Sequence, residues 1–227
     1  MSKPLIIFGT GKIAEVVSYY ALSECGLAIA AFTVDRASKQ SDTFLGRPVV
    51  PFDELPTLYP ADQFDIFIAV GYHNLNKLRA EKYTTAKALG YQAVSIVSPH
   101  AALASNVVYG ENCFIMPPCI IHPYVTMGNN VFVWSGTMIG HHSVIADHCW
   151  FTSSCNIGGN VTMGENCFVA LNATVSHSVR IGRVCFLGAN TLVTKDLDDG
   201  KVVISESSKP IKLNSAEFLR FSSFFSM

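Results

Sequence analysis

The chain has 227 residues, of which 49% are hydrophobic, and this composition excludes a wholly disordered protein. Sixteen lysines and arginines against seventeen acidic residues leave a formal net charge of −1 with no basic run, which favours small molecules over nucleic acid as partners. The longest apolar stretch, Leu27 to Val34, is far shorter than the roughly 20 residues of a membrane span, and no cleavable leader opens the chain, so we expect a cytoplasmic protein.

Residues 1–98 alternate short apolar runs with amphipathic stretches, which is typical of an α/β unit built on a parallel sheet. The pattern predicts strands over residues 5–8, 27–34, 65–70 and 93–97, and helices over 12–25 and 74–89. The run Ser98-Pro99-His100 breaks it, because the residue before a proline is driven out of helical geometry. We therefore expect a Rossmann-like domain over residues 1–98.

A glycine-containing loop, Gly9-Thr10-Gly11-Lys12, joins the first predicted strand to the first predicted helix, and Asp35 follows the second strand. Glycines in that context let backbone amides approach a phosphate at a helix N-terminus, as in dinucleotide-binding folds. The alternative is that they only make a tight strand-to-helix turn. An NAD-dependent oxidoreductase would share the loop, but nothing downstream offers a site for hydride transfer.

A six-residue period dominates the second half of the chain. Every sixth residue from Leu103 to Val193 is apolar, sixteen positions in all, and four places after each stands a mostly small residue. Similar hexads recur every 18 residues, so three of them make one coil. A single hexad cannot bury its inward side chains, but stacked triangular coils about 4.8 Å apart bury a continuous column. The repeat therefore predicts an all-β domain, a parallel β-helix, over residues 99–204.

Six of the seven cysteines occupy the small inward position of the hexads: Cys113, Cys119, Cys149, Cys155, Cys167 and Cys185. An odd number of cysteines cannot close into a disulfide framework, and a free cysteine packs as a small hydrophobic residue. We expect packed free thiols rather than nucleophiles or metal ligands.

The pattern aliphatic-Gly/Ala-x-x-small-x, unbroken over residues 103–198, resembles the hexapeptide signature of the left-handed β-helix acyltransferases. With the α/β unit and the segments 138–145 and 164–168, the chain resembles the branch that contains sialic acid O-acetyltransferases, UDP-bacillosamine N-acetyltransferase and GDP-perosamine N-acetyltransferase. The left hand is implied by this resemblance, because parallel crossovers are otherwise nearly always right-handed. The resemblance also implies acetyl-CoA as co-substrate, a role in polysaccharide biosynthesis, and a homotrimer with active sites between adjacent subunits.

By the same resemblance, His141 is the general base, and its place in the hexad directs it outward. Relatives often carry an acid beside this histidine, where this chain has His142, which we count with His141 as a catalytic residue. Asp147 or a residue of another subunit remains a candidate for orienting the base. His177 stands two coils further on, and we expect it roughly 10 Å from His141 as an outward polar residue.

The resemblance implies two binding regions. The CoA groove between two prisms would lie near Trp150, Leu171, Gly188 and Ala189. The nucleotide-linked sugar would lie around Thr10, Gly11, Lys12, Asp35 and Gly71.

We expect no metal ion in this chain. A β-helix carbonic anhydrase would need a pair of metal-binding histidines five residues apart, and Met127 and Ala146 occupy the places that would pair with His122 and His141.

The function we expect is transfer of acetyl from acetyl-CoA to the amino group of a nucleotide-linked amino-deoxy-sugar. Two alternatives remain open: an O-acetyltransferase of sialic acid or a polysaccharide sugar, and a non-catalytic nucleotide-binding protein. The tail, residues 205–227, lacks the Gly-x-Pro-Ala-Lys run of the relatives. There Asn214 or Ser215 is expected to cap a short helix with an apolar face made by Phe218, Leu219, Phe221, Phe224 and Phe225.

Overall fold

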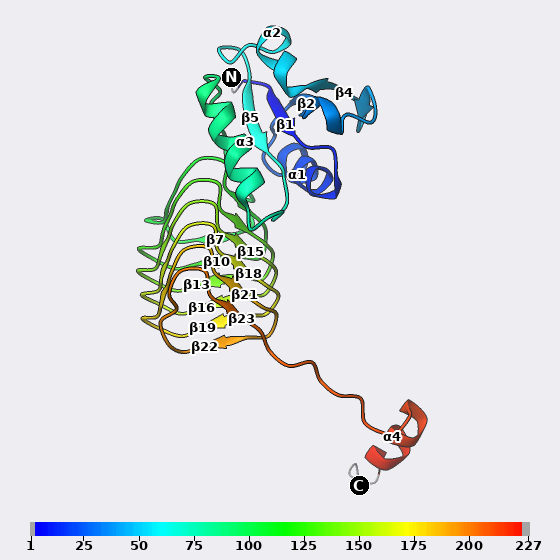
Figure 1. The fold of residues 1–227 in the computed structure, drawn as a ribbon, viewed down its shortest axis with the longest axis vertical. Coiled ribbons are helices and arrows are strands. Elements are labelled where there is room, and N and C mark those ends of the chain that lie inside the picture. Colours follow the sequence, from blue (N-terminus) through cyan, green and yellow to red (C-terminus); the bar gives the residue numbers. More distant parts are fainter. Residues whose placement is uncertain (1–2, 224–227) are drawn as a thin grey trace.

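The computed structural model describes residues 3–223 and shows an α/β unit at one end of a long prism, with a C-terminal tail that leaves the other end (Figure 1). The α/β unit is built on a five-stranded sheet of order β3-β4-β2-β1-β5. Strands β1 (Leu5–Phe8), β2 (Ile29–Val34), β4 (Arg47–Pro51) and β5 (Asp65–Ile68) are parallel, and β3 (Thr43–Phe44) is an antiparallel edge strand.

Strand β1, which lies inside this sheet between β2 and β5, is buried on both faces. Leu5 and Ile7 of β1 pack in one hydrophobic cluster with helix α1 (Lys12–Ser23), and Ile6 and Phe8 pack in a second cluster with helix α3 (Lys77–Ala88). An all-apolar strand has no face to offer to solvent, so helices cover both sides of the sheet. The short elements η1 (Arg36–Ser38), η2 (Phe52–Glu54) and α2 (Leu55–Leu58) make the remaining connections.

Three details of this unit differ from the sequence-based prediction. The hairpin of β3 and β4 was not predicted, because its residues show no long apolar run. Helix α3 begins at Lys77 rather than at residue 74, since Asn74, Leu75 and Asn76 take positive φ angles that a helix cannot accommodate. The strand predicted over residues 93–97 is divided: Ala93 makes a single parallel bridge to Ile66 of β5, and β6 (Ile96–Val97) pairs with the prism.

The prism has three faces of parallel two-residue strands, which we number in the order in which the chain visits them. Face 1 contains β6, β9 (Phe114–Ile115), β12 (Phe132–Val133), β15 (Trp150–Phe151), β18 (Phe168–Val169), β21 (Phe186–Leu187) and β23 (Val202–Val203). Face 2 contains β7 (Ala102–Leu103), β10 (Ile120–Ile121), β13 (Met138–Ile139), β16 (Asn156–Ile157), β19 (Thr174–Val175) and β22 (Leu192–Val193). Face 3 contains β8 (Val108–Tyr109), β11 (Thr126–Met127), β14 (Val144–Ile145), β17 (Thr162–Met163) and β20 (Arg180–Ile181).

The pairing register matches the period of the sequence. Ile139 pairs with Ile121 in the coil before and with Ile157 in the coil after, each 18 residues away. Three hexads therefore close one coil, as predicted, and the arrangement fits a left-handed β-helix. Its hydrophobic core is the inward column of aliphatic residues and cysteines.

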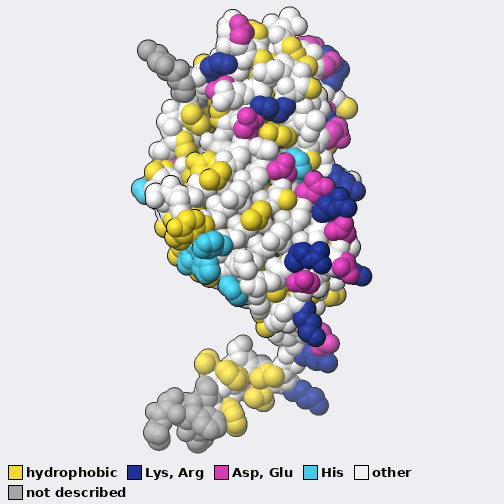
Figure 2. All heavy atoms as spheres, turned by 90° about the vertical axis from the view of Figure 1, so that its left-hand side faces the viewer, with side chains coloured by type: hydrophobic (Ala, Val, Ile, Leu, Met, Phe, Trp, Pro, Cys, Tyr) yellow, Lys and Arg dark blue, Asp and Glu magenta, His cyan; other side chains and the backbone are white. Residues whose placement is uncertain are grey.

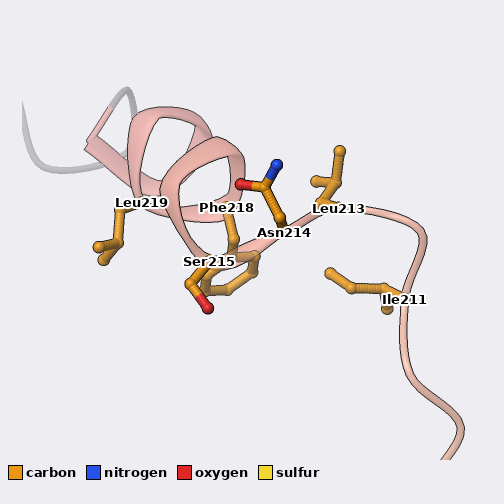
Figure 3. Close-up of a pocket in the computed structure, with 6 residues that line it drawn as sticks. All are labelled: Ile211, Leu213, Asn214, Ser215, Phe218 and Leu219. Carbon is orange, nitrogen blue, oxygen red and sulfur yellow. The ribbon is translucent and has the colours of Figure 1, made fainter.

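The tail carries helix α4 (Ser215–Ser223), which Asn214 and Glu217 cap reciprocally: the Glu217 amide donates to Asn214 Oδ1 at 3.0 Å, and the Asn214 amide to Glu217 Oε2 at 2.9 Å. The tail extends away from its own prism (Figure 1). An open hollow of about 410 Å³ lies between this helix and the preceding chain, and only tail residues line it: Ile211, Leu213, Asn214, Ser215, Phe218 and Leu219 (Figure 3).

Phe224 and Phe225, which the sequence assigns to the same apolar face, lie outside the described residues. Within residues 3–223, no helix is both long enough and apolar enough to cross a membrane.

The inward cysteines are packed thiols. All seven cysteines are free, and the six at the small hexad position are buried. The Cys149 thiol donates to the Gly164 carbonyl at 3.2 Å, and the Cys167 thiol to the Gly182 carbonyl at 3.1 Å. Burial raises the pKa of Cys113 and Cys155 to about 11, which leaves almost no reactive thiolate at neutral pH.

A thiol titration tests this core. In denaturant without reductant, we expect seven reactive thiols per chain, whereas the native protein should expose Cys25 alone to rapid modification because the others are buried. Fewer than seven thiols in freshly purified, denatured protein would reveal disulfides and contradict the packing described here.

Candidate functional site

Two adjacent histidines occupy the corner between faces 2 and 3. Strands β13 and β14 hold this corner, and both His141 and His142 are exposed, as the hexad position predicted. The two Nδ1 atoms are 3.0 Å apart, which is a hydrogen-bond distance. Figure 2 shows histidine side chains gathered at one edge of the prism.

This contact assigns different roles to the two rings. Only one Nδ1 can carry the shared proton, so one ring donates and the other accepts. When His141 donates from Nδ1, its Nε2 keeps a free lone pair that can take a proton from a substrate. His142 has a φ of 59°, and its ring stacks on Tyr124 of the preceding coil, with ring centroids 4.6 Å apart.

The structure thus puts His142, rather than Asp147, beside the candidate base. Asp147 lies at the next corner, between faces 3 and 1, where its Oδ1 accepts a hydrogen bond from the Asn129 amide at 2.8 Å. The corner turns separate the two groups, because Asp147 follows β14 whereas His141 precedes it.

The absence of a side chain at Gly159 lets the imidazole of His177 approach that of His141. Gly159 lies one coil after His141, and a Cβ at this position would come within 2.7 Å of His141 Nε2. Across this gap the rings of His141 and His177 are 5.9 Å apart between centroids. The expected separation of roughly 10 Å is therefore wrong for the side chains, because they lean toward each other over the glycine.

Four of the five predicted acceptor residues gather at one edge of the N-terminal sheet. Thr10, Gly11 and Lys12 follow β1 at the start of α1, and Gly71 follows the neighbouring strand β5. Gly9 has a φ of 124°, and a Cβ there would come within 2.9 Å of the Ala69 carbonyl oxygen, so this tight turn requires glycine.

Asp35, the fifth predicted acceptor residue, follows β2 and forms an ion pair with Lys82 of α3, with Asp35 Oδ1 and Lys82 Nζ 2.8 Å apart. Burial by itself would lower the pKa of Lys82. The hydrogen bond and negative charge of Asp35, together with those of Glu81, outweigh that effect, so the pKa of Lys82 is raised. Sequence reasoning missed Lys82, because nothing in its helical pattern reveals which strand end it faces.

The predicted CoA residues lie around the corner between faces 1 and 2. Leu171 is 55% exposed there, and Gly188 and Ala189 line a hollow of about 470 Å³ that the chain closes with residues 204–208. Trp150 lies on face 1 instead, only 2% exposed, and its ring is covered by Tyr72 and by the guanidinium of Arg79.

Within one chain, the acceptor loop and the histidine pair lie on different sides of the prism. The N-terminal unit packs on face 1, where Phe132 and Phe168 share a hydrophobic cluster with Val17 of α1. His141 stands at the corner between the other two faces. No group of three or more His, Cys, Asp or Glu side chains within residues 3–223 is arranged to hold a metal ion.

Comparisons with known proteins agree with the fold. No family model and no curated protein matches the chain. Among solved structures, a histidine variant of perosamine N-acetyltransferase from Caulobacter crescentus, in complex with CoA and GDP-perosamine, has a TM-score of 0.82 at 27% identity over 89% of this chain and 93% of that one. The chain is an acyltransferase.

Two further structures share its fold. The acetyltransferase domain of PglB from Neisseria gonorrhoeae FA1090, in complex with acetyl coenzyme A, has a TM-score of 0.81 at 21% identity over 93% of this chain and all of that one (100%). WeeI from Acinetobacter baumannii AYE has a TM-score of 0.69 at 20% identity over 89% and 96% of the two chains. The acyltransferase thus resembles the hexapeptide-repeat sugar acetyltransferases across both its α/β unit and its prism.

Two neighbouring glycines of this acyltransferase allow a matched test. Gly159→Ala should lower the rate of acyl transfer by about 10- to 100-fold with little loss of stability, because the three atoms nearest to its methyl group all belong to the movable imidazole of His141. Gly158→Ala should instead lower the melting temperature, because its Cβ would come within 2.6 Å of the backbone nitrogen of His177. An active Gly159→Ala enzyme would show that the space above His141 Nε2 is not used.

Proposed function

We propose that the chain is an N-acetyltransferase that moves acetyl from acetyl-CoA to the amino group of a nucleotide-linked amino-deoxy-sugar. The observation that carries this proposal is the His141–His142 contact, which engages Nδ1 of His141 and leaves Nε2 free above Gly159. The similarity to a perosamine N-acetyltransferase solved with CoA and GDP-perosamine supports the choice of both substrates.

The division of labour follows the two structural units. Residues 1–98 would form a Rossmann-like domain that holds the nucleotide-linked sugar through Thr10, Gly11, Lys12, Asp35 and Gly71. Residues 99–204 would form the acyl-transfer domain, and residues 205–227 the tail. The glycine loop supports this assignment, since its backbone amides stand at the N-terminus of α1, where an anionic phosphate is stabilised.

The complete active site would lie between subunits of a homotrimer. A single chain separates its acceptor loop, above face 1, from its histidines at the corner of faces 2 and 3. Docking the face 2–face 3 corner of one subunit against the face 1–face 2 corner of the next would bring the histidines of one chain to the acceptor loop of the other. The CoA would then run along the groove between prisms, near Leu171, Gly188 and Ala189. Trp150, the fourth residue predicted for this groove, is buried beneath Tyr72 and Arg79 and would not contact the CoA.

Direct acetyl transfer requires that the protein orient the two substrates and supply one general base. The acceptor nitrogen attacks the thioester carbonyl carbon, and His141 Nε2 takes the proton that the nitrogen loses. The carbon–sulfur bond then breaks, and the imidazolium returns the proton to the departing thiolate. Backbone amides of the prism would stabilise the negative charge on the carbonyl oxygen.

The partner of the base favours an amine over a hydroxyl as acceptor. A protonated His141 would donate from Nδ1 to the neutral ring of His142. A carboxylate in the place of His142 would stabilise that imidazolium with its negative charge and so make His141 a stronger base. A sugar hydroxyl must lose its proton almost as it attacks and needs the stronger base. An amine attacks with its own lone pair and releases its proton later.

Two alternative functions make different predictions in one assay of CoA release. The proposed enzyme should release CoA thiol from acetyl-CoA only with nucleotide-linked amino sugars. An O-acetyltransferase would respond to sialic acid or polysaccharide sugars, and a nucleotide-binding protein without activity would release none.

His141 provides the mechanistic test in that assay. His141→Ala should lower turnover at least about 100-fold while acetyl-CoA still binds, because general-base catalysis is worth about 10² to 10⁴-fold. His177→Ala should have a much smaller effect and serves as the matched control. Turnover close to the wild-type value in the His141 variant would exclude it as the base.

Asp35 tests the assignment of the acceptor. Asp35→Ala should weaken binding of the nucleotide sugar by roughly ten- to a hundredfold, since a hydrogen bond to a charged group contributes about 1.5 to 3 kcal/mol, and should leave acetyl-CoA affinity unchanged. Calorimetric titration of each substrate measures both. Because Asp35 also pairs with Lys82, equal weakening of both substrates would indicate general damage instead.

A further inference from the structure

A buried arginine joins the N-terminal unit to the prism, and the proposed chemistry does not use it. Arg79 lies in the first turn of α3 and is 0% exposed. Its Nε donates to Asn130 Oδ1 at 3.0 Å, and its Nη2 donates to the carbonyl oxygens of Asn130 at 3.1 Å and His148 at 2.9 Å. These acceptors belong to the corner between faces 3 and 1, so one side chain spans both units.

Within residues 3–223, Arg79 is a buried cation without a carboxylate partner. Its guanidinium lies 4.4 Å from the ring centroid of Phe132 and 5.0 Å from that of Trp150, and no carboxylate of residues 3–223 forms an ion pair with it in the structure. Burial lowers its pKa to about 9. The guanidinium therefore contributes directional hydrogen bonds rather than an ion pair, through donors held in one rigid plane.

The segment that Arg79 holds is strained. Asn74, Leu75 and Asn76 have φ angles of 49°, 48° and 65°, three consecutive left-handed residues without a glycine. Such a run is unfavourable for L-amino acids and persists only where surrounding contacts enforce it. Asn76 makes those contacts: its Oδ1 accepts from Arg79 Nη1 at 3.2 Å, and its Nδ2 donates to the Cys167 carbonyl at 3.1 Å.

This strained loop begins at the acceptor edge of the sheet. It follows Gly71, where a Cβ would lie 3.8 Å from Ile13 of the glycine-loop helix α1. The next residue, Tyr72, lies against Phe168 and Trp150 of face 1, with ring centroids 4.5 and 5.6 Å away. The loop of residues 71–76 therefore connects the acceptor edge to the prism, in addition to the hydrogen bonds between Ile68 and Asn112.

We propose that Arg79 is a positioning residue, which together with Asn76 locks the loop of residues 71–76 onto the prism and so sets where the acceptor amine is presented for transfer. This inference rests on the proposed function for the identity of the acceptor. The lock itself is a property of the chain without substrates, so it can be tested separately.

Hydrogen exchange of the substrate-free protein tests the lock. In Arg79→Met, amides of residues 69–80 should exchange at least roughly tenfold faster, while amides of residues 157–163 in the prism should not change, because only the loop loses its contacts. Arg183→Met, which removes an exposed arginine paired with Asp199, is the matched control and should alter neither region. Equal acceleration in both regions would show a general loss of stability and overturn the proposal.

Kinetics test the consequence for acceptor positioning. Arg79→Met should lower kcat/KM for the amino-sugar acceptor at least roughly tenfold and leave acetyl-CoA affinity unchanged, since the donor groove lies at other corners. Arg79→Lys keeps the charge but not the planar guanidinium, so its exchange rates and kcat/KM should lie between those of the wild type and Arg79→Met. If Arg79→Met does not fold, Arg79→Lys serves for both tests. Normal acceptor kinetics in a folded variant would overturn the positioning role. A wild-type enzyme inactive on every amino sugar would instead refute the proposed function, and the exchange result would still decide whether the lock exists.

Discussion

The parallel ladder that joins residues 18 apart is the interaction on which the rest of this protein depends. It brings every hexad position into a column, so that the inward columns form the core and one outward column carries the candidate site. Tyr124, His142 and Asn160 occupy the same position of successive coils, as do His141, Gly159 and His177. The stacking of His142 on Tyr124 and the opening above His141 both follow from this register.

The second constraint is the way in which the α/β unit packs on a single face of the prism. Aromatic side chains of face 1 supply the apolar contact, and Arg79 supplies directional hydrogen bonds at its margin. Packing on face 1 leaves the corner between faces 2 and 3 exposed, with its histidines available to another molecule. The same packing is the reason that the proposed function places the complete site between subunits, since one chain separates its glycine loop from its histidines.

Most of the fold was readable from the repeat. An apolar residue every six positions and a small residue four places later predict the triangular coil. Six cysteines at the small position predict part of its core, where the structure places them. The N-terminal unit was less predictable at its margins: the β3–β4 hairpin lacks an apolar run, and three left-handed residues delay the start of α3. The left-handed residues depend on contacts with the prism, such as that of Asn76 with the Cys167 carbonyl, which no local pattern encodes.

The sequence by itself determined which residues point outward or inward along the prism, because a side chain's direction depends only on its place in the hexad. It thereby predicted outward histidines at 141 and 142 and buried cysteines, whereas the glycine loop was predicted from the strand and helix on either side of it. Only the tertiary structure decided which of these meet. The hydrogen bond between the two histidines, the approach of His177 over Gly159, the ion pair of Asp35 with Lys82 and the burial of Arg79 all join side chains whose conformations, or whose elements, are arranged by packing. Rotamers and interdomain contacts are set by neighbours distant in the chain, which a repeating local pattern cannot specify.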